Sequence, residues 1–140
     1  MLERTLPGTW VLVRTGTGSG TDAAKPFEVS YRLISNSSAL VETWGVNSAR
    51  ETESVFHPDH TRVLLTHYCA QGNQPRLRAT DVGDDAIVFR FVDVTNREPS
   101  QDMLVERTLH LARSSLEIVE VYRTARGADE RTVYRFVRRE

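Results

Sequence analysis

The strongest constraint on the fold is a two-residue alternation of apolar and polar side chains that runs through most of the chain. Such alternation is typical of β-strands with one buried and one exposed face. The alternating segments are rich in Val, Ile, Thr, Phe and Tyr, the residues that strands prefer. We predict strands over the ranges 8–15, 26–35, 39–45, 50–57, 61–69, 75–82, 86–94, 103–112, 115–124 and 131–138.

Short joints with turn residues separate these strands, for example Gly72-Asn73 and Gly83-Asp84-Asp85. One short helical turn is expected over 2–6, before Pro7. No stretch of a dozen residues shows a helical period, which excludes strand–helix–strand units and favours antiparallel pairing. The sequence therefore predicts an all-β fold.

A meander of this many strands has two exposed edges unless the sheet closes on itself. A closed up-and-down antiparallel β-barrel of about ten strands removes both edges and leaves an interior wide enough for a small ligand. An immunoglobulin-like sandwich is the alternative, but its crossings are usually longer than these joints. The 140 residues suit a single domain, which we expect to cover 1–140.

Composition excludes several classes of partner. The formal net charge of −1 argues against a nucleic-acid-binding surface, which needs a basic excess. The positive charge is almost all arginine, which indicates codon bias in a GC-rich bacterial genome; anion binding by guanidinium groups is the alternative. No window is apolar enough for a transmembrane helix, and the N-terminus lacks the apolar run of a signal peptide. Cys69 is the only cysteine, so no internal disulfide forms. We expect a cytoplasmic protein with neither nucleic-acid nor membrane partners.

Two motifs carry a resemblance to a known family. The first strand opens on Gly8-Thr9-Trp10, which resembles the start of the calycin superfamily of lipocalins and their relatives. More specific is the central stretch Thr66-His67-Tyr68-Cys69-x-x-Gly72-Asn73-Gln74-Pro75-Arg76, which resembles a family of small, uncharacterised bacterial lipocalin-like barrels. The likeness spans roughly residues 8 to 97.

The resemblance implies a barrel with a cavity and no settled activity. It also implies that the tryptophan closes the bottom of the barrel under an arginine of the last strand, either Arg135 or Arg138. Histidines that such barrels often carry before the eighth strand are replaced here by Met103-Leu104-Val105, so no role rests on them.

The strand over 61–69 has a mostly apolar face that includes His67. Val63, Leu65, His67 and Cys69 share this face, whereas Leu64, Thr66 and Tyr68 share the other. We expect the first face to point inward. His67 then either binds a polar ligand atom or acts as acid or base near neutral pH. The alternative is a core histidine satisfied by a backbone carbonyl or a carboxylate.

Glu42 shares its face with Leu40 and Trp44, which predicts a buried carboxylate that needs a partner. Arg76 or Arg78, after the central turn, is the expected cation. Such a pair either supports the fold or clamps a carboxylate ligand.

Other reactive residues have simpler explanations. Cys69 is expected to be a small buried filler, because no helix N-terminus is near to lower its thiol pKa. His57 and His60 flank Pro58-Asp59, where we expect a hairpin turn with exposed imidazoles rather than a metal site. His110 is an isolated candidate for a haem or ligand pocket. The glycine-rich stretch 16–20 lacks the following helix of a phosphate loop and is expected to be a hairpin at the barrel mouth.

The leading functional hypothesis is binding of a small amphipathic or hydrophobic molecule inside the barrel. The predicted ligand-binding residues are Tyr31, Glu42, Trp44, His67, Tyr68, Arg76, Phe89 and Phe91. Ile87, Phe89, Phe91 and Asp93 share one face that we expect to form a cavity wall. No cofactor and no metal are expected. The alternatives are a small enzyme that uses His67 as general acid or base with Arg76 stabilising negative charge, and a ligand-free structural or homodimerising module.

Overall fold

The computed structural model describes residues 1–15, 27–46 and 48–140. Its elements are α1 (Leu2–Thr5), β1 (Gly8–Thr15), β2 (Glu28–Ile34), β3 (Ala39–Trp44), β4 (Thr52–Asp59), β5 (Arg62–Tyr68), β6 (Gln74–Val82), β7 (Ala86–Thr95), β8 (Met103–Leu111), β9 (Ser115–Arg123) and β10 (Asp129–Arg138). Every predicted strand is present, with ends within two residues of those expected.

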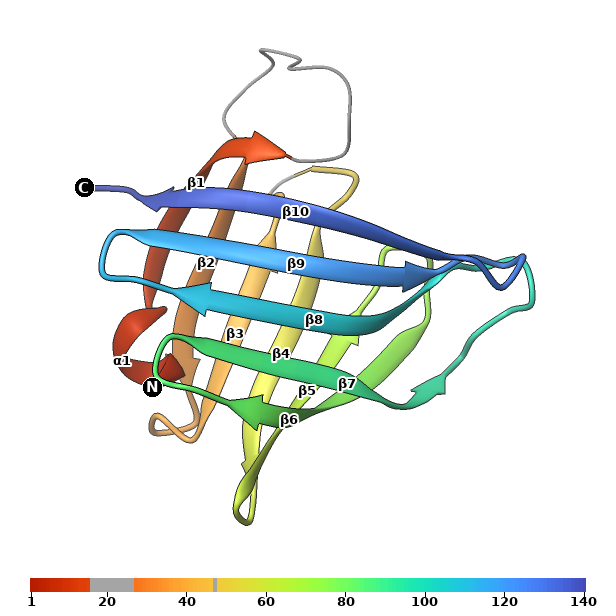
Figure 1. The fold of residues 1–140 in the computed structure, drawn as a ribbon, viewed down its shortest axis with the longest axis horizontal. Coiled ribbons are helices and arrows are strands. Elements are labelled where there is room, and N and C mark those ends of the chain that lie inside the picture. Colours follow the sequence, from red (N-terminus) through yellow and green to blue (C-terminus); the bar gives the residue numbers. More distant parts are fainter. Residues whose placement is uncertain (16–26, 47) are drawn as a thin grey trace.

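The strands form one closed antiparallel barrel in which sequence neighbours are also spatial neighbours. The ring closes between β1 and β10, where Trp10 lies opposite Arg138. Figure 1 shows β10 running alongside β1 and the short α1 at one end of the barrel. The prediction of an all-β, closed up-and-down barrel with a short N-terminal helical turn is confirmed.

One predicted turn is in the wrong place. We expected a turn at Pro58-Asp59, but β4 continues through both residues and Pro58 lies opposite Val63 of β5. The reversal occurs at His60-Thr61, where His60 takes the left-handed φ of 55°. The stretch 16–20 and the turn residue Asn47 lie outside the described residues.

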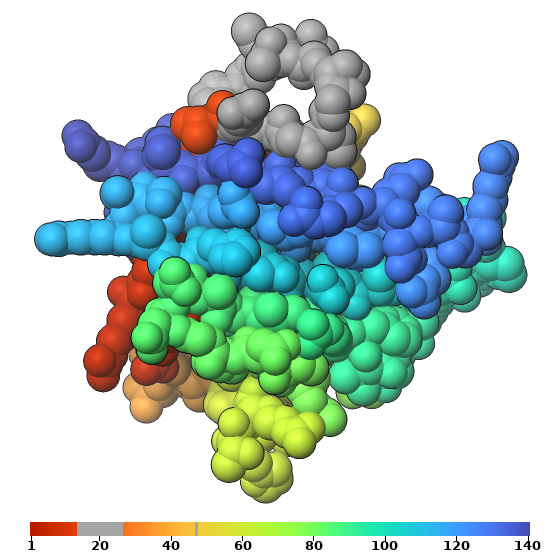
Figure 2. All heavy atoms as spheres, in the orientation of Figure 1, coloured from red at the N-terminus to blue at the C-terminus, as the bar shows by residue number. Residues whose placement is uncertain are grey.

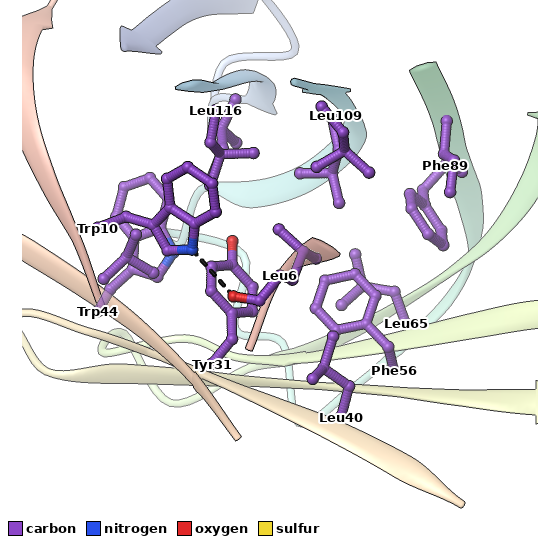
Figure 3. Packing of buried hydrophobic residues seen from close by; sticks show 14 of the residues in the cluster. Leu6, Trp10, Tyr31, Leu40, Trp44, Phe56, Leu65, Phe89, Leu109 and Leu116 are labelled. Carbon is purple, nitrogen blue, oxygen red and sulfur yellow. Dashed lines mark hydrogen bonds between the residues drawn. The ribbon is translucent and has the colours of Figure 1, made fainter. Parts of the chain in front are cut away.

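Leu6 and Trp10 close the barrel at the α1 end. Leu6 is fully buried at the end of α1, and its carbonyl oxygen accepts a hydrogen bond of 2.9 Å from Trp10 Nε1 (Figure 3). The Arg138 guanidinium lies 4.3 Å from the centre of the Trp10 ring. Arg138 is therefore the arginine over the tryptophan, whereas Arg135 is half-exposed and pairs with Glu117.

Arg138 also attaches the N-terminal segment to the barrel. Its Nη1 donates to the carbonyl oxygen of Pro7 at 2.9 Å, and its Nη2 donates to that of Thr5. The close approach requires a glycine at position 8, because Gly8 has φ of +127° and an added Cβ would lie 3.0 Å from Nη1 of Arg138. These contacts hold α1 over one end of the barrel.

The strand registers divide the interior into two tiers. Toward the α1 end, Leu40 lies opposite Phe56, and Phe56 lies opposite Leu65. The next inward-facing pair of β3 and β4 is farther from α1, and there Glu42 lies opposite Ser54. The tier near α1 is apolar, with Leu6 among the buried side chains of Phe56, Leu65 and Leu40 (Figure 3). The next tier is polar, and it contains the predicted site.

The outer wall of β7 to β10 is a continuous surface of packed side chains, with α1 visible at one end (Figure 2). Among the described residues, no helix has the length and apolar character needed to cross a membrane.

Candidate functional site

The half of the interior farther from α1 holds a connected group of polar side chains, which we call the polar cluster. Its members are the buried Tyr31, Glu42, Ser54, His67, Arg107 and Glu120 and the partly buried Tyr122. Most of them lie directly opposite another member on a neighbouring strand. Inward-facing positions of six strands, β2 to β5, β8 and β9, thus meet in one place.

Arg107 lies at the centre of the polar cluster. Its Nη1 donates to Glu42 Oε1 at 2.7 Å and to Ser54 Oγ at 3.2 Å, while its Nη2 donates to Glu120. The Tyr31 hydroxyl donates to the other oxygen of Glu42, at 2.6 Å. Charge-assisted bonds of this kind are stronger than neutral ones.

Burial and the neighbouring charges shift the pKa values of Arg107 and Glu120 in opposite directions. Burial works to lower the pKa of Arg107, but the carboxylates of Glu42 and Glu120 raise it overall. The guanidinium therefore stays charged. Burial raises the pKa of Glu120, and Arg107 partly opposes that rise. Such a buried set is stable only while its members are together, because each unpaired charge is costly to bury.

A hydrogen-bonded chain leads from Arg107 to Tyr122. Ser54 Oγ is 2.9 Å from His67 Nδ1, and the Tyr122 hydroxyl is 3.2 Å from His67 Nε2. Both ring nitrogens of His67 are thus within hydrogen-bond distance of a hydroxyl group, one from β4 and one from β9. Either tautomer of the imidazole satisfies both contacts, because each hydroxyl can donate or accept.

The environment of His67 keeps the imidazole neutral. Burial and the neighbouring Arg107 lower its pKa from 6.5 to about 3. Both ring nitrogens are engaged by protein groups. This arrangement makes His67 a poor acid or base toward a substrate, because neither nitrogen faces a free position.

A separate hollow of about 290 Å³ lies at the α1 end of the barrel. It is lined by residues of α1 and by the ends of β2 to β7 at the turns that surround α1. Its apolar lining includes Leu33, Leu40, Phe56, Val63, Val82 and Ile87. The polar lining residues are Glu3, Ser37, Ser38 and His57. We call this hollow the α1-end cavity.

The structure places five of the eight predicted ligand-binding residues inside the barrel, namely Tyr31, Glu42, Trp44, His67 and Phe89. Their inward orientation agrees with the predicted facing. Three of them, Tyr31, Glu42 and His67, belong to the polar cluster, and Trp44 lies next to it, 5.7 Å from Arg107. None of the eight lines the α1-end cavity. Their role in ligand binding stays a prediction.

Tyr68 and Arg76 lie on the outer surface, and Phe91, opposite the buried Leu77, is only partly covered. Tyr68 is 49% exposed, because side chains alternate along β5 and His67 points inward. Arg76 lies on the outer surface and pairs with Asp93 rather than with Glu42. The expected pairing of Glu42 with Arg76 or Arg78 is wrong, since Arg107 takes that place.

A β-bulge explains the incorrect wall prediction for β7. Arg76 lies opposite Asp93 and Leu77 opposite Phe91, so β7 has one extra residue, Val92, at this point. The extra residue reverses the alternation, which turns Asp93 outward. Phe91 lies at the bulge and is 37% exposed. Only the first part of the predicted face, Ile87 and Phe89, is buried inside.

The other reactive residues do not form a site. Cys69 is half-buried rather than fully buried, and burial raises the pKa of its thiol, which disfavours a nucleophilic role. His60 is exposed at the β4–β5 turn, and His57 is partly exposed with Nδ1 3.1 Å from the carbonyl oxygen of Pro58. His110 is exposed on the outer face of β8, away from the barrel interior.

Four members of the polar cluster were not among the predicted ligand-binding residues: Ser54, Arg107, Glu120 and Tyr122. The sequence does contain a signal for two of them, Arg107 and Glu120. Arg107 shares a face with Leu109 and Leu111, and Glu120 shares a face with Leu116 and Ile118. A charged residue on an apolar strand face is the same signal that identified Glu42, and it applies equally to β8 and β9.

Comparisons with known proteins bear on the fold alone. No family model matches the chain, and no curated protein matches it. Among solved structures, the barrel is similar to the crystal structure of Rv2717c from M. tuberculosis, with a TM-score of 0.67 at 15% sequence identity. The similarity covers 96% of this chain and 92% of that one. The match supports a shared barrel architecture.

Proposed function

We propose that the protein binds a small hydrophobic or amphipathic molecule in its barrel, and that the α1-end cavity is the binding site. The observation that carries the proposal is the cavity itself, about 290 Å³ with predominantly apolar walls. Ligand pockets of proteins are typically of a few hundred cubic ångströms, with mostly hydrophobic walls and a few polar groups that orient the ligand.

The lining residues indicate which parts of the ligand should be apolar and which polar. Leu40, Phe56 and Ile87 are buried and offer an apolar surface to the ligand body. Glu3 and His57, which also line the cavity, offer a carboxylate and an imidazole to a polar group. This division favours an amphipathic ligand that places its apolar end toward Phe56.

The polar cluster then acts as a fixed wall behind the cavity. Glu42 and Ser54 lie one step beyond Leu40 and Phe56 on the same strand faces. The alternative of an enzyme that uses His67 is not favoured, because both imidazole nitrogens are bonded within the protein and Arg76 lies outside.

We further infer kinship with the lipocalin-like barrels of the calycin superfamily. The packing of Arg138 over Trp10, at 4.3 Å, supports this relationship, because the resemblance implied a last-strand arginine at that place. Ligand binding in the barrel is consistent with such kinship.

A small apolar probe tests the proposed site. Benzotrifluoride, followed by ¹⁹F NMR, should bind saturably with a Kd on the order of 0.1 mM, as expected for about ten non-hydrogen atoms in an apolar pocket. Val63→Phe places a larger side chain in the α1-end cavity and should weaken binding by about tenfold or more.

Val92→Phe is the matched control, because Val92 is 42% exposed on β7 and does not line the cavity. It should bind the probe like the unaltered protein. Equal binding by both variants would refute the α1-end cavity as the site.

A further inference from the structure

The N-terminal segment over residues 1–6, which we call the strap, is attached to the barrel differently from every strand. Each strand is paired with a neighbour on both sides, because the sheet is closed. The strap contains the four-residue α1, none of whose residues is fully buried. A helix this short is not stable on its own in water. The position of the strap therefore depends on the few contacts that attach it to the barrel.

Two barrel side chains and one buried leucine make these contacts. Trp10 Nε1 donates to the carbonyl oxygen of Leu6 at 2.9 Å. Arg138 donates to the carbonyl oxygens of Thr5 and Pro7, the latter at 2.9 Å. The Leu6 side chain is 0% exposed and is the main apolar anchor. Segments held by few contacts open most readily, and release of this one breaks no strand ladder.

The junction between the strap and β1 has the backbone properties of a hinge. Pro7 has no backbone N–H, so rotation at this residue leaves no donor unpaired. Gly8 has φ of +127°, and glycine moves between conformations that other residues rarely adopt. Rotation of the strap can therefore be confined to Pro7 and Gly8.

Leu6 occupies space that adjoins the α1-end cavity. Leu40 and Phe56 line the cavity and also lie beside Leu6 in the apolar tier, together with Leu65 (Figure 3). Leu65 does not line the cavity, so it lies on the inner side of Leu6. Withdrawal of Leu6 would thus extend the cavity inward, toward Leu65.

We propose that the strap opens as a unit, by rotation about Pro7 and Gly8, while the barrel stays folded. In the open form the α1-end cavity is joined to the space that Leu6 leaves. The consequence for ligands rests on the proposed function: a straight apolar chain that is too long for the α1-end cavity binds only to the open form and keeps Leu6 displaced.

Hydrogen exchange at the Trp10 indole N–H tests the opening in the protein without ligand. This N–H exchanges after its bond to the Leu6 carbonyl oxygen is broken. By NMR, its protection factor should be at least about tenfold lower than those of the Phe89 and Ile118 amides, which lie in the buried barrel wall. Low urea concentrations should leave the exchange of the indole unchanged, because the opening exposes little surface.

Arg138→Met removes both donors to the strap and should speed exchange of the Trp10 indole by about tenfold. The change is measured relative to the Phe89 and Ile118 amides in the same sample, so a general loss of stability does not mimic it. Arg135→Met is the matched control, because Arg135 lies on the same strand and pairs with Glu117.

Two results would overturn the strap. One is a Trp10 indole with the same protection factor and the same urea dependence as the Phe89 and Ile118 amides, since it would then open only when the barrel unfolds. The other is an equal effect of Arg138→Met and Arg135→Met on the exchange of the indole.

Two straight-chain alcohols, n-hexanol and n-decanol, test the effect on ligand length. Neither has an aromatic ring that would itself shift the indole signals. Saturating n-decanol should shift the Trp10 indole N–H signal, because the indole loses its acceptor, whereas saturating n-hexanol should leave it in place. Arg138→Met should strengthen n-decanol binding by up to about tenfold and leave n-hexanol binding unchanged, because it raises the population of the open form.

The outcomes separate the strap from the proposed site. Saturable n-decanol binding with an unmoved Trp10 signal would overturn the strap and leave the α1-end cavity as a binding site. An equal shift at the indole of Trp44, which has no hydrogen-bond partner among the described residues, would indicate a change of the whole barrel and would also overturn the strap. If neither alcohol binds, the proposed site fails instead, and indole exchange in the free protein still decides whether the strap opens.

Discussion

Arg107 donates hydrogen bonds to carboxylates from two strands that are not neighbours, Glu42 on β3 and Glu120 on β9. It therefore connects opposite walls of the barrel through the interior. Removal of the guanidinium leaves two carboxylates facing each other in a buried place. The expected consequence is a large loss of stability that depends on pH.

We predict that Arg107→Met lowers the free energy of unfolding by about 3–5 kcal/mol at pH 7.5. Burial raises the pKa of Glu120, and without its cation that pKa rises further. A carboxyl with a raised folded-state pKa stabilises the protein at low pH, and that contribution is lost as pH rises. The cost of the substitution should therefore be smaller at pH 5 than at pH 7.5, as measured by urea denaturation.

Arg76→Met is the matched control for this substitution. Arg76 and Asp93 form an exposed pair whose side chains are 48% and 44% accessible, so loss of the pair should lower the free energy of unfolding far less than loss of Arg107. Similar losses in the two variants would contradict a central role for Arg107.

The lowered pKa of His67 makes a second contribution to the pH dependence of stability. Its folded-state pKa is lowered to about 3 from 6.5. The stabilisation from keeping it neutral is complete above pH 6.5, and it is lost as pH falls from 6.5 toward 3. In this window the loss should approach roughly 1.4 kcal/mol per pH unit.

Denaturation at pH 7 and pH 4.5 tests this prediction. His67→Gln should be less stable at pH 7 but should lose less stability on acidification than the unaltered protein. His110→Gln, on the exposed outer face of β8, should follow the unaltered protein. A His67→Gln variant with the same acid sensitivity would show that another group titrates.

At the residue scale, the sequence predicted which side chains face inward but not which of them contact each other. The inward orientation of Glu42 and His67 followed from their apolar neighbours on the same strand face. The partner of Glu42 did not follow, because Arg107 is 65 positions away and the contact is made across the barrel rather than between adjacent strands. Strand alternation predicts the face of a residue, whereas a contact across the interior depends on the closure of the whole sheet.

At the scale of elements, the central stretch from Thr66 to Ala79 holds two strand connections together. Asn73 is fully buried in the β5–β6 turn, and its Nδ2 donates to Gln101 Oε1 at 3.1 Å and to the carbonyl oxygen of Asp102 at 3.0 Å. Gly72 has φ of +96°, which a residue with a side chain rarely adopts. The motif therefore has a structural role in tying the β5–β6 turn to the β7–β8 connection.

A double-mutant cycle measures this tie. Asn73→Ala should cost about 1–3 kcal/mol of unfolding free energy, because a buried polar group loses its partners. Gln101→Ala should cost less, and the two effects should be coupled by at least about 0.5 kcal/mol. Strict additivity in urea denaturation would show that the two side chains act independently.

The elements themselves were largely predictable, because hydrophobic alternation and turn residues are local signals. The bulge at Val92 was not, since an extra residue in one strand is visible only in the register with its partner. The bulge is the reason that the predicted face of Asp93 was wrong. The turn at His60 was displaced for a similar reason, because Pro58 fits an end of β4 as well as a turn.

At the scale of the molecule, the exposed ion pairs lie on the outer wall, whereas the apolar hollow lies at the α1 end. Exposed arginines on the outer wall pair with carboxylates, including Arg90 with Asp81, Arg123 with Asp129 and Arg135 with Glu117. This pairing is consistent with the formal net charge of −1 and gives the outer surface no evident preference for anions. The apolar hollow at the α1 end is the place where we propose that a small molecule binds.

The most direct test of this account is a ¹H–¹⁵N NMR titration of the intact protein with benzotrifluoride. We predict saturable shift changes concentrated at amides that line the α1-end cavity, including those of Leu33, Leu40, Val63 and Ile87. Amides of β8 and β9, none of which lines the cavity, should change less. Shift changes scattered over the outer wall, or none at saturating probe, would contradict ligand binding at this end of the barrel.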